Sequence, residues 1–206
     1  MAKSNDIDEK SQAVLQAAST VFLAHGFSAA TTDMIQSKAG VSKATVYARY
    51  PNKEALFLAV IEHQCQAFDA QLQALAHLNS GIADTLESLG RAYLDVVLSP
   101  EALALFRVVV AEAHRFPQIG RTFYLRGPKV IHDHVQRILD TAAEKGELDL
   151  RSIGVAAATT LFLGMLRHEA QLECLTHPQA QPSEAQRDAW VHQAVVTLLR
   201  AYGSKT

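Results

Sequence analysis

The chain lacks most features of a secreted or disulfide-stabilised protein. Its 206 residues include two cysteines, Cys65 and Cys174, too few for a disulfide framework. No basic start is followed by an apolar run, so we expect no signal peptide and a cytoplasmic location. The longest apolar stretch, residues 154–166, is too short to span a bilayer.

Glycine, proline and strand patterns are also scarce. Ten glycines and six prolines argue against a disordered chain and against a β-rich protein with many tight turns. No segment alternates apolar and polar residues with a period of two, whereas apolar residues recur at three- and four-residue steps throughout. We therefore predict an all-α protein of about nine helices.

The sequence carries none of the common motifs of enzymes or metal sites. It has no P-loop, no dinucleotide-binding fingerprint, no G-x-S-x-G and no H-E-x-x-H. Among its nine histidines, His132 and His134 come closest to a chelating pair, but residues two apart point to different sides of a helix. We therefore expect no catalytic site, metal or cofactor. An all-helical enzyme ranks behind the two binding functions considered below.

The net charge is only −2, but it is unevenly distributed. Residues 28–53 carry four basic residues against one acid, Asp33, while the rest of the chain is acidic on balance. A local basic patch is what approach to a polyanion requires. The positive stretch is therefore the place to look for a nucleic-acid site.

Two short helices joined by a sharp turn are predicted within this basic stretch. Gly26 should end the first helix of the chain, and Thr31 or Thr32 should cap the second. Gly40 supplies a left-handed turn residue, and Ser42 caps the third helix. This is the pattern of a helix-turn-helix, whose second helix enters the DNA major groove. The outward positions of that helix would be Lys43, Ala44, Thr45 and Tyr47.

The stretch from Val14 to Leu58 resembles the DNA-binding head of the tetracycline-repressor (TetR) family. It has an aromatic after a glycine, a threonine pair, an isoleucine, the run Ala-Gly-Val-Ser, and then Tyr, Pro and Lys-Glu-Ala-Leu. The resemblance implies a three-helix DNA-binding head at residues 1–52 and a helical ligand-binding and dimerisation body at residues 53–206. The sequence departs from the family pattern at Ala44, where a glycine is common, at Arg49, for an aromatic or histidine, and at Tyr50, for phenylalanine.

Carried over by position, the resemblance implies a set of DNA contacts. The phosphate-binding residues would be Thr32, Lys43, Tyr47, Arg49 and Lys53. The residues at or near base edges would be Ser42, Ala44 and Thr45. The alternative for each is an ordinary surface or capping role, and for Thr32 and Ser42 both roles are compatible.

The rest of the chain has no motif of similar specificity. Residues 106–129 resemble one C-terminal subfamily of these regulators, and family members enclose a small-molecule pocket in the body. The candidate wall residues are Phe68, Phe106, Val110, His114, Phe123, Phe162 and Met165. Plain core packing is the alternative for each. The basic residues among 106–129 would either attract an anionic effector or form a solvated face.

The last two long helices have wide apolar faces. One is predicted from Asp149 to Leu175, and the other opens with a capping box, Ser183 to Gln186. In the resembling family these helices form the interface of a homodimer, while ordinary core packing would need one stripe from each. The expected interface residues are Val155, Phe162, Leu163, Leu166, Trp190, Val195, Leu198 and Leu199.

Two functions from different classes follow. The first is a ligand-responsive homodimeric regulator, most simply a repressor that a small molecule releases from double-stranded operator DNA. Its fourth helix, expected from Lys53 to His77, would join the ligand pocket to the head. The second is a helical small-molecule-binding or interaction protein without DNA binding, which the near-neutral charge and the three departures favour. Neither function involves a membrane.

Overall fold

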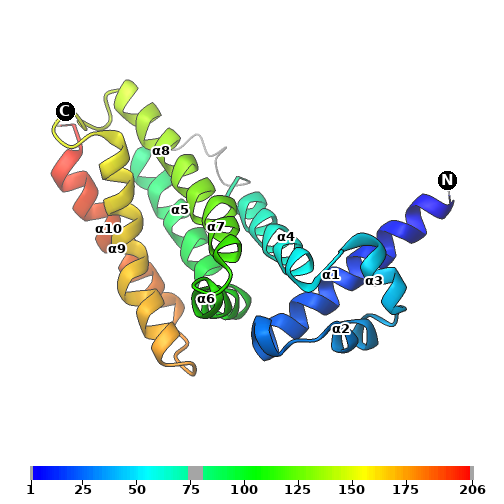
Figure 1. The fold of residues 1–206 in the computed structure, drawn as a ribbon. Helices are drawn as coiled ribbons and strands as arrows, with labels where there is room; N and C mark the ends of the chain where they lie inside the picture. The colour runs from blue at the N-terminus through cyan, green and yellow to red at the C-terminus, as the bar shows by residue number, and fades with distance from the viewer. Residues whose placement is uncertain (1, 74–80, 205–206) are drawn as a thin grey trace. The chain divides into compact units, whose positions relative to one another are not determined.

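A computed structural model describes residues 2–73 and 81–204 and shows them as helices joined by short turns (Figure 1). No strand occurs in these ranges, which confirms the all-α prediction. The helices are α1 (Ala2–Ala29), α2 (Thr32–Ala39), α3 (Lys43–Arg49), α4 (Lys53–Gln73), α5 (Ile82–Val97), α6 (Pro100–Glu112), α7 (Pro117–Arg126), α8 (Pro128–Glu144), α9 (Val155–Thr176) and α10 (Glu184–Tyr202). The predicted end of the fourth helix, at His77, lies outside the described residues.

The chain divides into two compact units. Unit 1 comprises residues 1–66 and 104–126, and unit 2 comprises residues 67–103 and 127–206. The predicted head at residues 1–52 lies wholly within unit 1. That unit also contains the start of α4, most of α6 and all of α7.

The starts of α2 and α3, and the turn between them, follow the sequence signals. The hydroxyls of Thr31 and Ser42 cap α2 and α3, each accepting a hydrogen bond of 3.2 Å from the amide three residues later. Gly40 has φ 66°, the left-handed conformation that lets the chain turn between the two helices. Gly26, at φ 77°, interrupts the helical backbone near the end of α1. The expected caps at Thr31 and Ser42 and the turn at Gly40 are confirmed, with Thr31 rather than Thr32 as the cap of α2. The first helix kinks at Gly26 but ends only at Ala29.

Phenylalanine rings form the centre of unit 1. Phe22 and Phe57 are completely buried, with ring centroids 4.7 Å apart. Phe27 packs against both, at 5.9 and 5.2 Å. Phe116, which follows α6, meets Phe27 edge to face at 4.9 Å. Because Phe116 packs against this ring cluster, the segment after α6 belongs to the same core as the first three helices. The ring pairs stabilise that core beyond the burial of their apolar area.

Unit 2 is built around α5, α8, α9 and α10. In this unit α10 packs against α5 and α9, and α8 packs against α9. The buried side chains of its core come from all four helices and include Leu86, Leu139, Phe162 and Val191. Each helix therefore contributes one apolar face to a common interior.

Gly90 lets α5 approach α10 closely. A Cβ atom at this position would lie 2.9 Å from Val191 Cγ1, too close for two carbon atoms. We expect Gly90→Ala to lower the free energy of unfolding of the chain by about 1–3 kcal/mol through overpacking, despite the better helix propensity of alanine. Urea unfolding measures this change.

Val191→Ala provides the control for the Gly90 prediction, because it removes the methyl group that the new Cβ would meet. The double variant should be less destabilised than the sum of the two single variants. Additive losses would show that the predicted clash is not the cause.

α9 begins at Val155, so its predicted start at Asp149 is wrong. The backbone before Val155 is engaged elsewhere: the amide of Asp149 donates to the carbonyl of Tyr202 at 2.7 Å, and that of Ser204 donates to Glu147 at 3.0 Å. The Asp149 carboxylate pairs with Arg151, which lowers the pKa of Asp149 to about 2. The carboxylate that suggested a helix start is therefore held by its own loop.

None of the helices in residues 2–73 and 81–204 combines the length and the apolar character that a membrane span requires.

Candidate nucleic-acid interface

α3 presents one face to the core of unit 1 and another to the surface. Val46 is buried together with Ile35 of α2, which fixes the rotation of α3 about its axis. Ser42, Lys43, Ala44, Tyr47 and Arg49 are exposed, and Thr45 is partly exposed. The outward residues expected for a recognition helix therefore lie at the surface.

Two hydroxyl pairs lie on this surface. The hydroxyls of Thr32 on α2 and Tyr47 on α3 are 3.1 Å apart, and those of Ser42 and Thr45 are 2.9 Å apart. Each pair uses one of its two protons for the internal hydrogen bond. The other proton is available for an acceptor such as a phosphate oxygen, so the pairs fit the phosphate contacts of a helix-turn-helix.

The basic residues of this surface differ in their partners. The ammonium of Lys43 lies 2.9 Å from the carboxylate of Asp33, and both side chains are exposed. That hydrogen bond raises the pKa of Lys43, so the amine stays protonated. Exposed ion pairs contribute little to stability. A phosphate can therefore replace Asp33 as the partner of Lys43 at small cost.

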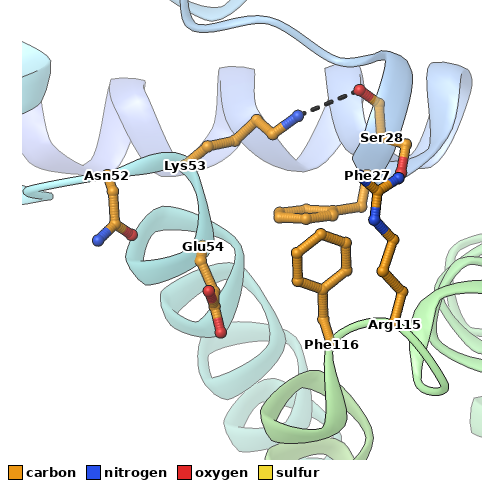
Figure 2. A pocket seen from close by; sticks show the side chains of 7 residues that line it. All are labelled: Phe27, Ser28, Asn52, Lys53, Glu54, Arg115 and Phe116. Atoms are coloured by element: carbon orange, nitrogen blue, oxygen red, sulfur yellow. Dashed lines mark hydrogen bonds between the residues drawn. The ribbon is translucent and has the colours of Figure 1, made fainter.

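Lys53, at the start of α4, already holds part of the head together. Its ammonium donates a hydrogen bond of 3.1 Å to the carbonyl of Ser28 and lies 4.7 Å from the ring centroid of Phe27 (Figure 2). It also donates to the carbonyl of Ala30, at 3.0 Å. An ammonium has three protons, so one remains for a further acceptor. The predicted phosphate contact of Lys53 stays a prediction, and its replacement would also remove a structural contact.

One contact of the head was not visible in the sequence. The carboxylate of Glu112, at the end of α6, accepts a hydrogen bond of 3.0 Å from the amide of Ser28. The two residues are 84 positions apart, and no local pattern relates them. This bond and the Phe27–Phe116 ring pair fasten the segment after α6 to the end of α1.

The candidate pocket residues are distributed over both units. Unit 1 contains Phe106, Val110, His114 and Phe123, and unit 2 contains Phe162 and Met165, while the side chain of Phe68 lies outside the described part. Phe106 and Phe123 meet edge to face at 6.0 Å. Val110 is exposed and Phe162 is completely buried. Their role in a ligand pocket stays a prediction.

The candidate dimer residues all belong to unit 2, and none of them is fully exposed. Phe162, Leu166, Val195 and Leu198 are buried, and Val155, Leu163, Trp190 and Leu199 are partly buried. The large apolar side chains of α9 that are exposed are instead Leu161, at 50%, Met165, at 37%, and Leu172, at 54%. Because residues 161–166 of α9 are all apolar and cover every side of the helix, the sequence did not distinguish its inner face from its outer face.

The described residues give little support to other chemistry. Within them no group of three or more His, Cys, Asp or Glu side chains is placed to hold a metal ion. Burial raises the pKa of the Cys65 thiol to about 12, and Cys174 is also buried. Since the thiolate is the reactive form of cysteine, Cys65 is unsuited to redox chemistry at neutral pH.

The fold and the α2–α3 geometry define a class: a helix-turn-helix protein with an all-helical second unit. Residues 14–60 match the family described as bacterial regulatory proteins, tetR family. Residues 84–204 match the C-terminal domain of AefR-like transcriptional repressors. The chain therefore belongs to the TetR family of DNA-binding transcriptional regulators.

Several members of this family are similar over most of the chain. The HTH-type transcriptional regulator SrpR of Pseudomonas putida is 24% identical over 161 residues, which cover 78% of this chain and 73% of SrpR. A TetR-family regulator structure from Mesorhizobium loti MAFF303099 has a TM-score of 0.85 at 25% identity, covering 96% and 98% of the two chains. The flavonoid-responsive regulator FrrA has a TM-score of 0.76 at 29% identity, with the same coverage. These similarities point to transcriptional regulation rather than catalysis.

Proposed function

We propose that this protein is a cytoplasmic, homodimeric repressor that a small molecule releases from operator DNA. The observation that carries the proposal is the outward face of α3, which presents exposed polar side chains. The Ser42 cap and the buried Val46 hold α3 in the orientation that exposes this face. Phosphate oxygens accept hydrogen bonds from hydroxyls and from Lys or Arg side chains, while Ala and Thr side chains suit base edges. The predicted domain division, 1–52 for DNA and 53–206 for ligand and dimer, is part of this proposal.

The DNA-binding part is tested with a labelled duplex that spans the region upstream of the protein's own gene. We expect a sequence-specific complex whose affinity falls steeply with salt, as counterion release from phosphates requires. A footprint should show two protected half-sites roughly 34–36 Å apart, if the simple helix-turn-helix geometry applies. Retention of ligand without any sequence preference for DNA would favour the alternative of a helical binding protein.

We predict that Tyr47→Phe weakens operator binding without changing its salt dependence. The substitution removes one hydroxyl but no charge. A hydrogen bond to a charged group is worth about 1.5–3 kcal/mol, so the loss should be roughly tenfold or more for each protomer. Fluorescence anisotropy in graded salt measures both quantities.

The matched control for this prediction is Tyr124→Phe, which removes the same hydroxyl from a more exposed tyrosine of α7. It should leave the affinity for the operator unchanged. If Thr45→Ala weakened binding while Tyr47→Phe had no effect, the assignment of Tyr47 to a phosphate would be wrong.

The dimer part of the proposal is supported by the outer face of α9. Leu161, Met165 and Leu172 recur at helical spacing and are exposed in the single chain. Gly164 lies among them, and no atom comes within 4 Å of a Cβ built at this position. A two-fold dimer uses the same patch on both subunits, and an apolar helix face with a glycine suits such close approach.

The ligand part is supported by family membership and by one relative that is described as flavonoid-responsive. α4 has residues in both units, so a ligand that favours one tilt of this helix would change the position of the head. A coupling of about 1–3 kcal/mol would change operator affinity about 5–150-fold. A flavonoid such as naringenin is the first probe: it should release the operator duplex and raise the melting temperature of the protein. Failure of this probe with intact DNA binding would exclude naringenin as the effector.

A further inference from the structure

A pocket lies in unit 1 where the end of α1, the start of α4 and the turn after α6 meet (Figure 2). It has a volume of about 280 Å³. The residues that line it are Phe27, Ser28, Asn52, Lys53, Glu54, Arg115 and Phe116. Lys53 is the only candidate DNA contact among them, and none of them is a candidate wall residue of the effector pocket. A ligand held here would therefore bind apart from the proposed effector site.

Two phenyl rings give this pocket an apolar wall. The ring of Phe27 is buried, and the partly exposed ring of Phe116 meets it edge to face at 4.9 Å. A third ring packs favourably against such a pair in an offset or edge-to-face arrangement. The volume lies just below the range of roughly 300–1,000 Å³ that holds drug-sized ligands, so the pocket suits a ligand with a single small ring.

Arg115 places a cation at the pocket. Its guanidinium carbon lies 5.3 Å from the ring centroid of Phe116, and within residues 2–73 and 81–204 no carboxylate pairs with it. A guanidinium stays charged at every physiological pH, and its N–H groups match the two oxygens of a carboxylate. Because the ring restricts the position of the guanidinium, its donors are held in place for an anionic group.

Glu54 gives the pocket a charge of the opposite sign. It lies in the first turn of α4 and is partly exposed, and its carboxylate has no hydrogen-bond or ion-pair partner in the same part of the chain. In the view of Figure 2 the rings of Phe27 and Phe116 lie between Glu54 and Arg115. A carboxylate accepts hydrogen bonds and donates none, so Glu54 repels a simple anion but accepts from a hydroxyl. The two charges together favour a ligand with an acid at one end and a hydroxyl at the other.

We propose that this pocket binds a small aromatic carboxylate that carries a hydroxyl on its ring. The ligand carboxylate pairs with Arg115, the ring packs against Phe116, and the hydroxyl donates to Glu54. Occupancy ties the turn after α6 to the start of α4, beside the hydrogen bond from Lys53 to the carbonyl of Ser28. The inference goes beyond the proposed function, because it requires neither operator binding nor the effector pocket.

The first test titrates para-hydroxybenzoate and its neutral counterpart, para-hydroxybenzamide, into the purified protein by isothermal titration calorimetry. The acid should bind the unaltered chain more tightly than the amide. Arg115→Gln should weaken binding of the acid by roughly tenfold or more, because it removes a hydrogen bond to a charged group, and should leave binding of the amide nearly unchanged. Arg121→Gln is the matched control: it removes an exposed arginine of α7 that does not line the pocket, and should change neither affinity.

The second test concerns Glu54 and compares para-hydroxybenzoate with benzoate, which lacks the hydroxyl. The hydroxylated acid should bind the unaltered chain more tightly, and Glu54→Gln should bring the two affinities together, since it weakens the acceptor and removes the repulsion at the same time.

Three results would overturn the inference. They are the absence of binding to the unaltered chain, equal affinities of that chain for the acid and the amide, and an affinity for the acid that Arg115→Gln leaves unchanged. The first two need no variant to fold. Operator binding, measured on the same preparation, tests the proposed function separately, so the failure of one is distinguishable from the failure of the other.

Discussion

Replacing Leu161 with glutamate is expected to convert the proposed dimer into a monomer. The two-fold axis of such a dimer brings equivalent patches together, so each interface would receive two carboxylates in apolar surroundings. An unpaired buried charge costs about 3–5 kcal/mol, which raises the dimer dissociation constant by roughly two to four powers of ten. Light scattering after gel filtration should then give the 22.4 kDa mass of one chain rather than twice that value.

Leu125→Glu is the matched control for Leu161→Glu, because it introduces the same charge at an equally exposed leucine of α7. It should leave the dimer intact. Operator binding should fall with Leu161→Glu, since a monomer carries one head. A wild-type chain that is already monomeric, or a Leu161→Glu variant that stays dimeric, would refute the assignment of this face.

Replacing Phe22 with alanine is expected to lower the free energy of unfolding of unit 1 by about 3–5 kcal/mol. Phe22 is completely buried and packs against Phe27 and Phe57, so its removal leaves a cavity among rings that cannot close it. Far-ultraviolet circular dichroism during urea unfolding measures the loss. The single tryptophan, Trp190, lies in unit 2, so its fluorescence should respond less than the helical signal.

Tyr124→Ala serves as the control for Phe22→Ala. This exposed ring should change the free energy of unfolding by no more than about 0.5 kcal/mol. Phe22→Ala should also weaken operator binding, because α2 and α3 rest on the ring cluster. An unfolding transition that did not move would show that the cluster contributes little to unit 1.

The sequence predicted those parts of the structure that local chemistry decides. The caps at Thr31 and Ser42 and the turn at Gly40 each depend on interactions within a few residues, so their patterns could be recognised without a fold. The outward positions of α3 followed from helical spacing together with that turn, and in the structure they leave Val46 buried with Ile35 of α2. For the candidate DNA surface, this was sufficient to place the outward face of α3.

Long-range contacts and the choice between similar faces could not be predicted in this way. The bond between Glu112 and Ser28 joins residues far apart in the chain, and the start of α9 depends on backbone partners near Tyr202. On α9 itself, Leu161 and Phe162 are adjacent and equally apolar, yet only Leu161 is exposed. Burial of one rather than the other is decided by packing against α8 and α10.

The membership of residues 104–126 in unit 1 has a practical consequence for engineered regulators. Consider a chimera that exchanges the first 52 residues for those of a relative. The relative's residues would then take the places of Phe27 and Ser28 and would face this chain's Phe116 and Glu112. The ring at position 27 would have to match the ring that faces it, and position 28 would have to keep its backbone amide, the donor to Glu112, which any residue except proline provides. Grafts that transplant α7 and the preceding turn along with the DNA-reading helices should therefore recover operator recognition more often than grafts cut at the motif alone.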